Sequence, residues 1–342
     1  MLYNVGFFRS QTADVATIVV GNLSLGGSGK TPHTAYIAAL LLKKKYQIAI
    51  LSRGYGRKTS GFVLANDLAT PNSIGDEPHQ FYQQFGNKVA VAVCENRVEG
   101  IKKLLKINPN IDIVLLDDGF QHRKLKAGLY ILLTHFSRPF FKDFVFPYGN
   151  LREKKTNASR ADVVIYTHSP KNMNIYDKKQ WINKAKQTIS QTIVFSNYKY
   201  LQAIDTEDNI FLLDSNLRLL LFTGIANAKP LIDHLETEKN IALTHLQFKD
   251  HHQYTKKDAK TIIETHQTIG EKKHAFVLTT QKDVSKLLPY KSMFDQAAIA
   301  LVYLPIQIEM NPEDTALLNK KIMDYVINAI LNKKYQSQSS KI

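Results

Sequence analysis

The sequence predicts an α/β protein: a P-loop NTPase-like, mostly parallel sheet flanked by helices, followed by a second, smaller α/β unit. Two observations carry this prediction. Short apolar runs alternate with helix-like segments along most of the chain, as they do where helices join parallel strands. In addition, residues 16–31, read ATIVVGNLSLGGSGKT, join a β-branched run to a glycine-rich turn that ends in Lys and Thr.

The first strand is expected over Ala16–Val20, and a helix over Thr34–Lys45 after Pro32. Pro suits the first helical turn because its missing N–H has no helical partner there. The turn in between has the composition of a loop that binds a polyphosphate through backbone N–H groups, a Lys and a Mg²⁺-binding Thr. We therefore expect a nucleoside triphosphate to bind at Leu25, Gly26, Gly27, Ser28, Gly29, Lys30 and Thr31.

One position departs from the general phosphate-loop pattern. The pattern places a Gly five residues before Gly29, where this chain has Ser24. The alternative interpretation is therefore a glycine-rich turn with a structural role only.

Two later turns are further candidates. The strand predicted over Gln47–Ser52 leads into Arg53-Gly54-Tyr55-Gly56-Arg57. Arg53 and Tyr55 in such a loop suit contact with a substrate or a phosphate, although an ordinary turn with solvated arginines is the alternative. Asp76 follows Gly75 at the start of a predicted helix, where a capping or helix-dipole role is the simpler interpretation.

A pair of carboxylates follows the strand predicted over Ile111–Leu116. This strand is mostly apolar and runs directly into Asp117 and Asp118. A buried parallel strand of this kind brings its last residues to the edge of the sheet where nucleotides bind. Together with the phosphate loop, this position makes Asp117 or Asp118 a candidate Mg²⁺ ligand.

An aromatic and basic loop follows the strand predicted over Leu129–Thr134. Residues 135–148 hold five Phe and one Tyr beside Arg138 and Lys142. Such a loop either rests on a bilayer interface or folds into the protein, and the sequence favours neither.

Composition limits the function classes. The 342 residues carry 45 Lys and Arg against 30 Asp and Glu, a formal charge of +15, which fits an anionic partner or a generally basic surface. No nucleic-acid-binding motif accompanies the charge, so a nucleic acid partner is not expected. The single Cys94 excludes a disulfide framework and a multi-thiolate metal site within the chain. The longest apolar run near the start, Val15–Val20, is too short to span a bilayer, and we expect a cytoplasmic location.

The second half again alternates strands and helices after a polar, Lys-rich segment. We expect a phosphate-loop domain over 1–168, a second α/β unit over 169–332 and a frayed tail over 333–342. In the second unit, an Asp–His pair at Asp250 and His251 has the chemistry of a general base, although a surface histidine is the simpler interpretation. Residues 279–283 (TTQKD) are a candidate nucleotide contact but lack the spacing of guanine-reading motifs.

Seven motifs taken together resemble one family. In order they are GNLSLGGSGKTP, SRGYGR, GDEP, DDGFQHR, NLRE, FKDHHQY and TTQKD. This series resembles the bacterial tetraacyldisaccharide 4'-kinases, which act late in lipid A biosynthesis, and the resemblance runs from about Tyr3 to Leu288. It also accommodates Ser24, because that family accepts a hydroxyl residue at this position of the loop.

The resemblance implies a kinase that moves the γ-phosphoryl group of ATP onto the 4'-hydroxyl of a lipid disaccharide 1-phosphate. It implies that Lys30 and Thr31 hold the phosphates and Mg²⁺, and that Asp76 and His251 orient and deprotonate the hydroxyl. The same resemblance places four residues at or near the metal, Asp117, Asp118, Gln121 and Glu153, and two residues at the substrate, His122 and Arg152.

The resemblance also implies peripheral attachment to the cytoplasmic face of the inner membrane of a Gram-negative-type bacterium. Members of the family usually begin with a longer hydrophobic helix that docks on the membrane, whereas this chain begins close to its first predicted strand. We therefore expect either a misassigned start or docking through Phe7, Phe8 and the aromatic loop. The competing functions are a soluble P-loop kinase with another acceptor and an ATPase switch without an enzymatic product.

Overall fold

A computed structural model describes residues 9–185, 188–215, 218–269 and 276–339. The chain divides into two units. Unit 1 comprises Met1–Tyr198 and Ile308–Ile342, and unit 2 comprises Lys199–Gln307. The predicted docking residues Phe7 and Phe8 lie outside the described residues. In the part of the chain that the structure describes, no helix is long and apolar enough to cross a membrane.

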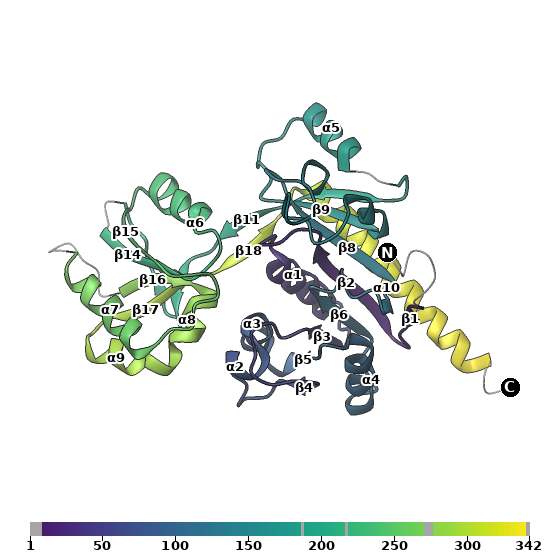
Figure 1. The fold of residues 1–342 in the computed structure, drawn as a ribbon, viewed down its shortest axis with the longest axis horizontal. Helices are drawn as coiled ribbons and strands as arrows, with labels where there is room; N and C mark the ends of the chain where they lie inside the picture. Colours follow the sequence, from purple (N-terminus) through teal and green to yellow (C-terminus); the bar gives the residue numbers. More distant parts are fainter. Residues whose placement is uncertain (1–8, 186–187, 216–217, 270–275, 340–342) are drawn as a thin grey trace. The chain divides into compact units, whose positions relative to one another are not determined.

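Unit 1 is built on an 8-stranded sheet with the strand order β10-β9-β8-β2-β6-β3-β5-β4 (Figure 1). Every pairing in this sheet is parallel except that of β4 with β5. The strands are β2 (Ala16–Asn22), β3 (Ile48–Ser52), β4 (Val63–Leu64), β5 (Val89–Val93), β6 (Ile113–Asp117), β8 (Leu129–His135), β9 (Val163–Thr167) and β10 (Thr192–Phe195). The short strands β1 (Gln11–Thr12) and β7 (Leu125–Lys126) pair separately.

Helices cover both faces of this sheet because its central strands are apolar on both sides. Ile18 of β2 packs with residues of α1, α3 and α10, whereas its neighbour Val19 packs with residues of α4 on the opposite face. The helices of unit 1 are α1 (Lys30–Lys43), α2 (Pro71–Ile74), α3 (Asp76–Phe85), α4 (Arg97–Ile107), α5 (Ile175–Ala185) and α10 (Pro312–Ser339). Short 3₁₀ helices lie at Gly86–Lys88, Phe140–Lys142 and Lys155–Arg160.

Unit 2 has a 6-stranded sheet with the order β13-β12-β17-β16-β14-β15. Its strands are β12 (Ala203–Asp205), β13 (Ile210–Phe211), β14 (Arg218–Thr223), β15 (Ala242–Gln247), β16 (Phe276–Thr280) and β17 (Ala300–Leu304). Its helices are α6 (Lys229–Asp233), which continues as a π-helix over His234–Glu238, α7 (Lys256–Gln267), α8 (Gln281–Leu287), a 3₁₀ turn at Leu288–Tyr290 and α9 (Lys291–Gln296). The chain leaves and re-enters unit 1 through β11 (Asn197–Tyr200) and β18 (Ile306–Glu309), which pair with each other.

The predicted fold class, a mostly parallel sheet with a second α/β unit, is confirmed. The unit boundary differs from the one expected after residue 168, because the polar segment after β9 contains α5, whose Trp181 packs into unit 1 against Phe136 and Tyr166. The end of the chain differs as well. Helix α10 belongs to unit 1 and continues to Ser339, through most of the segment expected to be a frayed tail.

The sequence left open whether the aromatic loop, residues 135–148, folds into the protein or lies at its surface, and the structure shows one half of the loop in each place. Phe140 is buried, and Phe136 and Phe141 pack against the core of unit 1 near Trp181. Phe144, Phe146 and Tyr148 are instead exposed by 66%, 66% and 92%. The first half of the loop is therefore core, and the second half presents aromatic rings to the surface.

Candidate active site

The glycine-rich loop joins the buried strand β2 to helix α1. Gly26 and Gly29 have φ angles of +96° and +80°, a conformation that L side chains rarely adopt. Gly29 precedes α1 and supplies no side-chain cap, and the first turn of the helix contains no acidic residue. The N–H groups of this helix N-terminus are therefore left for an anion, as in phosphate-binding loops.

Ser24 is accommodated because its backbone is paired rather than turned. It forms an antiparallel bridge with Leu151, while the N–H of Leu25 donates to the carbonyl of Asn150 at 2.7 Å and that of Arg152 to the carbonyl of Leu23 at 2.6 Å. Paired backbone of this kind accepts any side chain, so a Gly is not required here. The same pairing positions Arg152 and Glu153 beside the loop.

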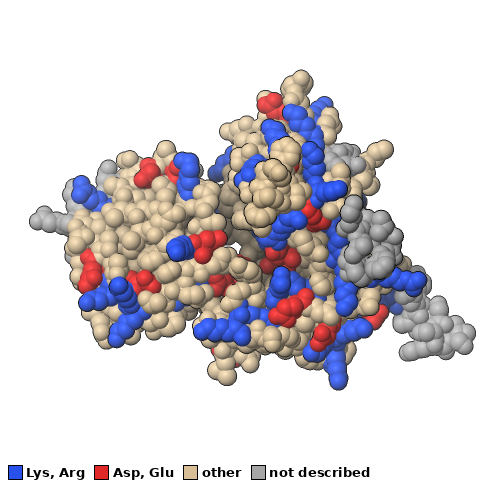
Figure 2. All heavy atoms as spheres, viewed as in Figure 1, with Lys and Arg blue, Asp and Glu red and all other residues tan. Residues whose placement is uncertain are grey.

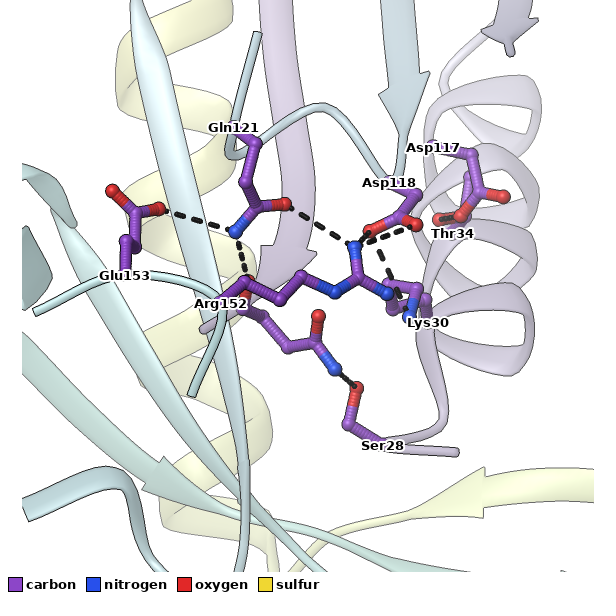
Figure 3. A network of polar contacts seen from close by, with 9 residues as sticks. Ser28, Lys30, Thr34, Asp117, Asp118, Gln121, Arg152 and Glu153 are labelled. Carbon is purple, nitrogen blue, oxygen red and sulfur yellow. Dashed lines mark hydrogen bonds and ion pairs between the residues drawn. The ribbon is translucent and has the colours of Figure 1, made fainter. Parts of the chain in front are cut away.

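Lys30, Asp118 and Arg152 form the centre of a polar network (Figure 3). Lys30 Nζ lies 3.7 Å from Asp118 Oδ1, and Arg152 Nη1 donates to both carboxylate oxygens of Asp118 at 3.1 and 3.2 Å. Arg152 Nη1 also lies 3.4 Å from Oε1 of Gln121. Asp118 thus links the lysine of the phosphate loop to an arginine from a distant part of the sequence.

Asp117 is the last residue of β6 and is buried. Thr34 Oγ1 donates to its Oδ1 at 3.0 Å. Burial, together with the neighbouring charge of Asp118, raises the pKa of Asp117 to about 7, against the opposing effect of Lys30. At neutral pH this carboxyl group is therefore only partly ionised, and additional positive charge nearby would favour its ionised form.

Gln121 and Glu153 extend the network on the other side of Arg152. Gln121 Nε2 donates to the carbonyl of Asn22 at 2.7 Å and to Glu153 Oε1 at 3.1 Å. Glu153 also accepts from Arg160 and Asn157, each at 2.7 Å. Glu153 therefore holds Gln121 in place, and Gln121 holds the end of the strand from which the phosphate loop begins.

The residues at this edge of the sheet fit a magnesium ion. Thr31, Asp117 and Asp118 offer the hard oxygen ligands that Mg²⁺ prefers. Among the described residues, no group of three His, Cys, Asp or Glu side chains is arranged to hold a metal. Mg²⁺ does not need such a group, because in nucleotide sites it keeps one or two carboxylates and takes phosphate oxygens and water as its remaining ligands.

The loop of Arg53 and Tyr55 packs against the turn that precedes Asp76. A side chain at Gly75 would come within 2.9 Å of the Tyr55 carbonyl oxygen, so these two segments approach backbone to backbone. Asp76 is the buried first residue of α3, and Gly75 occupies the capping position, so Asp76 is not the cap itself. Its place in the first helical turn remains favourable for a carboxylate.

His122 lies in the loop after β6 and is half-buried. Burial and the charges of Arg97, Lys124 and Arg53 lower its pKa to about 4. The imidazole is therefore neutral at pH 7, so it can donate or accept a hydrogen bond to a substrate but adds no positive charge for a phosphate.

His251 lies in unit 2, in the loop after β15, with a positive φ of 57°. Lys282 Nζ lies 3.1 Å from Nδ1 and 3.3 Å from Nε2 of its ring, and Asp250 lies 3.9 Å away. The adjacent His252 instead contacts Asp258 Oδ2, an oxygen that also takes part in the capping of α7. Asp76 belongs to unit 1 and His251 to unit 2, and each unit is described by itself, so their pairing stays a prediction.

Comparisons with known proteins agree with one another. A family model described as LpxK, tetraacyldisaccharide-1-P 4'-kinase, matches residues 1–323. The chain belongs to this family. The tetraacyldisaccharide 4'-kinase of Flavobacterium johnsoniae is 41% identical to it, over 90% of this chain and 86% of that protein. The tetraacyldisaccharide 4'-kinase of Cytophaga hutchinsonii is 38% identical to it, over 94% of this chain and 90% of that protein.

A solved structure shares the fold over nearly the whole length. LpxK from Aquifex aeolicus, crystallised in complex with ATP, aligns with a TM-score of 0.70 and 27% identity, covering 95% of this chain and 93% of that chain. The family predicted from the seven motifs is therefore confirmed, together with its α/β architecture.

The structure of this kinase-family member brings together most of the site residues predicted in unit 1. Lys30, Asp118, Gln121, Arg152 and Glu153 form one contact network, and Asp117 is within electrostatic reach of Lys30 and Asp118. Tyr55 and Leu25 are 70% and 50% exposed. The roles of all these residues remain predictions.

Two residues near the site escaped the sequence analysis. Arg97 is buried at the start of α4, donates to the carbonyl of Cys94 at 2.7 Å, and is electrostatically coupled to Asp117, Asp118 and Arg53. A cation at a helix N-terminus is unfavourable for the helix dipole, and this signal could have singled it out. His33 of α1 is also buried, and nothing in its sequence context distinguishes it from a core residue.

Proposed function

We propose that this chain transfers the γ-phosphoryl group of ATP to the 4'-hydroxyl of a tetraacyldisaccharide 1-phosphate. The observation that carries the proposal is the open N-terminus of α1 with Lys30 beside Asp118 and Arg152, in a chain that belongs to the tetraacyldisaccharide-1-P 4'-kinase family. Phosphoryl transfer needs alignment and charge neutralisation more than covalent participation by the protein.

On the donor side, the backbone N–H groups of 25–31 bind the β- and γ-phosphates and Lys30 neutralises charge that develops between them. The carboxylate of Asp118 forms ion pairs with both Lys30 and Arg152, so both cations are positioned before a nucleotide binds. Arg53, Tyr55, His122 and Arg152 are the proposed contacts of the lipid substrate and its phosphate.

Thr31, Asp117 and Asp118 would hold Mg²⁺. Gln121 and Glu153 would position the end of β2 beside this site through their hydrogen bonds to the Asn22 carbonyl and to each other. When bound, the ion neutralises phosphate charge and favours the ionised form of Asp117.

On the acceptor side, His251 takes the proton of the 4'-hydroxyl as its oxygen attacks the γ-phosphorus, and Asp76 orients the imidazole. Lys282 Nζ lies against the same ring, 3.1 Å from Nδ1 and 3.3 Å from Nε2. This assignment requires the loops of Asp76 and His251 to meet around the substrate.

The reaction is tested with purified protein, MgATP and tetraacyldisaccharide 1-phosphate in detergent, with the lipid followed by mass spectrometry. A product heavier by one phosphate is expected, and its absence would contradict the proposal. Lys30→Met should lower kcat at least about 100-fold, because it removes a charge that acts in the transition state. Lys43→Met, an exposed lysine at the other end of the same helix, is the matched control and should keep wild-type turnover.

The base is tested by His251→Ala, with His252→Gln as its neighbouring control. Loss of a general base lowers kcat by about 10²–10⁴-fold, while ATP affinity should remain. His252→Gln can keep the contact with Asp258, so its turnover should change little. Near-normal kcat in His251→Ala would assign the proton transfer to another group.

We also propose that the exposed half of the aromatic loop attaches the protein to an anionic membrane surface. Phe144, Phe146 and Tyr148 expose their rings, and Lys155 Nζ lies 6.0 Å from the centre of the Phe144 ring. On the face seen in Figure 2, Lys and Arg are spread over the surface among acidic residues. Because basic and acidic residues are mixed on this face, membrane binding through a local aromatic and basic contact is favoured over attraction by the net charge alone.

The attachment is tested by sedimentation with vesicles of anionic phospholipid. Phe146→Asp should reduce the bound fraction several-fold, because it places a charge where an aromatic ring enters the interface. Tyr176→Asp, at a similarly exposed aromatic position on α5, is the control and should bind like the wild type. Equal binding of both variants would exclude this loop as the contact, whereas unchanged ATP affinity shows that the site is intact.

A further inference from the structure

Three loops of unit 2 meet at one edge of its sheet. Strands β16, β14 and β15 are adjacent and parallel, so the segments that follow them lie beside one another (Figure 1). Gly224 follows β14, the loop of His251 follows β15, and helix α8 follows β16. The motif at residues 279–283 (TTQKD) therefore lies close to the loop of the proposed base.

The sequence analysis treats this motif as a candidate nucleotide contact, but two of its side chains are fully buried. They are Thr279 and Asp283. Thr279 Oγ1 donates to the carbonyl of Phe222 in β14 at 2.7 Å. Thr280 caps α8, since its Oγ1 accepts the N–H of Asp283 at 3.2 Å. A fully buried carboxylate does not reach a nucleotide directly, so Asp283 needs another role.

Asp283 connects α8 to the residue that follows β14. Its Oδ2 accepts from Thr280 Oγ1 at 2.7 Å and from the N–H of Gly224 at 3.0 Å. The carbonyl of Gly224 in turn accepts the N–H of His251 at 3.1 Å. Gly224 alone therefore separates the buried carboxylate from the backbone of the proposed base.

The packing around Gly224 leaves no room for a side chain. A Cβ at this position would lie 2.9 Å from Asp283 Oδ1, 3.1 Å from the hydroxyl oxygen of Tyr254 and 3.3 Å from Cβ of His252. The Tyr254 ring is itself packed edge-on against Phe222. Because close-packed groups move together, a displacement of the Asp283 carboxylate reaches the loop through Gly224.

The loop of His251 depends on such support. His251 has a φ of +57°, a conformation that is uncommon for a residue other than glycine and that persists where the surroundings enforce it. Two lysines of α8 contact the same loop. Lys282 Nζ lies 3.1 Å from Nδ1 of the His251 ring, and Lys286 Nζ donates to the carbonyl of His252 at 3.1 Å.

We propose that Asp283 is a positioning residue for the general base. Through Gly224 it holds the backbone of His251 so that the imidazole is oriented to accept the proton of the attacking hydroxyl group. The proposal rests on the proposed kinase function, in which His251 is the base. It gives the buried part of the motif at 279–283 a role in the reaction without contact with ATP or the lipid.

The first test asks whether the effect of Asp283 passes through His251. Asp283→Ala should lower kcat at least about tenfold, because a base displaced by about 1 Å loses much of its effect. Calorimetric titration should find its affinity for ATP within about twofold of the wild-type value. A loss of ATP affinity as large as the loss of kcat would make the motif a nucleotide contact and overturn the proposal.

The same substitution is then made in the His251→Ala background. There it should change kcat by less than about twofold, because the group that Asp283 positions is already absent. An equal fractional loss of kcat in the two backgrounds would show that Asp283 acts independently of His251, which overturns the proposal.

Asp258→Ala is the matched control within unit 2. Asp258 is the third residue of α7, as Asp283 is of α8, and its Oδ2 likewise accepts from the capping residue, Thr255, at 2.8 Å. It contacts the ring of His252 rather than Gly224. Asp258→Ala should therefore keep kcat within about twofold of the wild-type value, and a loss as large as that of Asp283→Ala would reduce both effects to helix capping.

A second variant keeps the proposal testable if Asp283→Ala disturbs folding, which circular dichroism checks. Gly224→Ala places a methyl group against Asp283 Oδ1 and leaves the Thr280 cap of α8 in place. It should lower kcat at least about fivefold in the wild-type background and less than about twofold in the His251→Ala background. Equal losses again count against the proposal.

Hydrogen exchange of the His251 N–H, resolved by NMR, measures the support of the loop without reference to activity. Exchange should be at least about tenfold faster in Asp283→Ala, whereas in Asp258→Ala it should stay within about twofold of the wild-type rate. Absence of lipid product from the wild type would overturn the kinase function, whatever the exchange rates. Normal product formation with unchanged kcat and unchanged exchange in Asp283→Ala would overturn the role of Asp283 and keep the kinase function.

Discussion

Ser24 and Gly29 illustrate how single positions of the phosphate loop differ in their tolerance. Ser24 lies in a bridge to Leu151, where its side chain costs nothing. Gly29 has a φ of +80°, and a Cβ there would collide with the hydroxyl of Tyr198. The backbone conformation at Ser24 therefore does not require glycine, which explains why the general pattern can be broken there. The conformation at Gly29 does require glycine, and glycine is retained there.

This contrast gives a prediction for two matched substitutions. Ser24→Gly should leave kcat/KM for ATP within about twofold of the wild-type value, since φ at this position needs no glycine. Gly29→Ala should lower kcat/KM at least tenfold, because the new methyl group displaces Tyr198 or the loop itself. Steady-state kinetics at varied ATP concentration provide the measurement, and a larger loss from Ser24→Gly than from Gly29→Ala would contradict the explanation.

Single residues also show why part of the site was predictable. Lys30, Asp117 and Asp118 stand next to strands and turns that are visible in the sequence, so their convergence follows from the parallel sheet. Arg152 and Glu153 are placed by backbone pairing with residues 23–25, a long-range contact with no local signal. Only their resemblance to a family motif identified them. Arg97 and His33 belong to none of the motifs, so the sequence analysis did not identify them.

Helix α10 shows how one element completes the core of unit 1. Leu318, Ile322 and Val326 are fully buried among residues of α1, α3 and the sheet, and the Tyr325 hydroxyl accepts the Thr17 N–H at 2.9 Å. The sequence predicts a helix after Glu313 but cannot show that it returns to the first sheet, because that choice depends on which apolar surface is left uncovered.

The contribution of α10 predicts a clear difference between two isoleucines on the same helix. Ile322→Ala should lower the free energy of unfolding of unit 1 by about 2–5 kcal/mol, as expected for a fully buried side chain. Ile327→Ala, at a position that is 44% exposed, should cost less than about 1 kcal/mol. Urea unfolding followed by the fluorescence of Trp181, the only Trp of the chain, reports on unit 1, and equal costs would contradict the packing.

Across the whole molecule, burial of histidines makes stability depend on pH. The pKa values of His33, His122 and His168 are each lowered to about 4, mainly by burial. All three are neutral in the folded protein at pH 5, whereas in the unfolded chain they are mostly protonated there. Their contribution to stability is therefore complete above about pH 6.5 and is lost as the pH falls toward 4.

His33 allows this dependence to be measured. Between pH 7.5 and pH 5, the wild type should lose about 2 kcal/mol more of its unfolding free energy than His33→Gln, which has no group that titrates in this range. Urea titrations at the two pH values, again followed through Trp181, give the comparison. Parallel losses in the two proteins would show that His33 takes up no proton on unfolding.

At this scale the sequence predicted two α/β units but not their boundary. Alternating strands and helices identify each sheet separately. The sequence of α5, however, is polar like that of a linker, and only the structure shows that its Trp181 packs against Phe136 and Tyr166. The return of the chain through β18 into α10 has no signature of its own, because pairing with β11 joins residues far apart in the sequence.

The insertion of unit 2 before α10 has a consequence for synthesis of the protein. Strands β2 to β10 leave the ribosome early, but α10, one of the helices that cover Ile18 and its neighbours on one face of their sheet, is made only after unit 2. Unit 2, a continuous stretch of chain, can fold as soon as it emerges, since domains generally fold as units during translation. The unit that is started first is therefore completed second, and the apolar surface that α10 covers lacks this helix while unit 2 is translated.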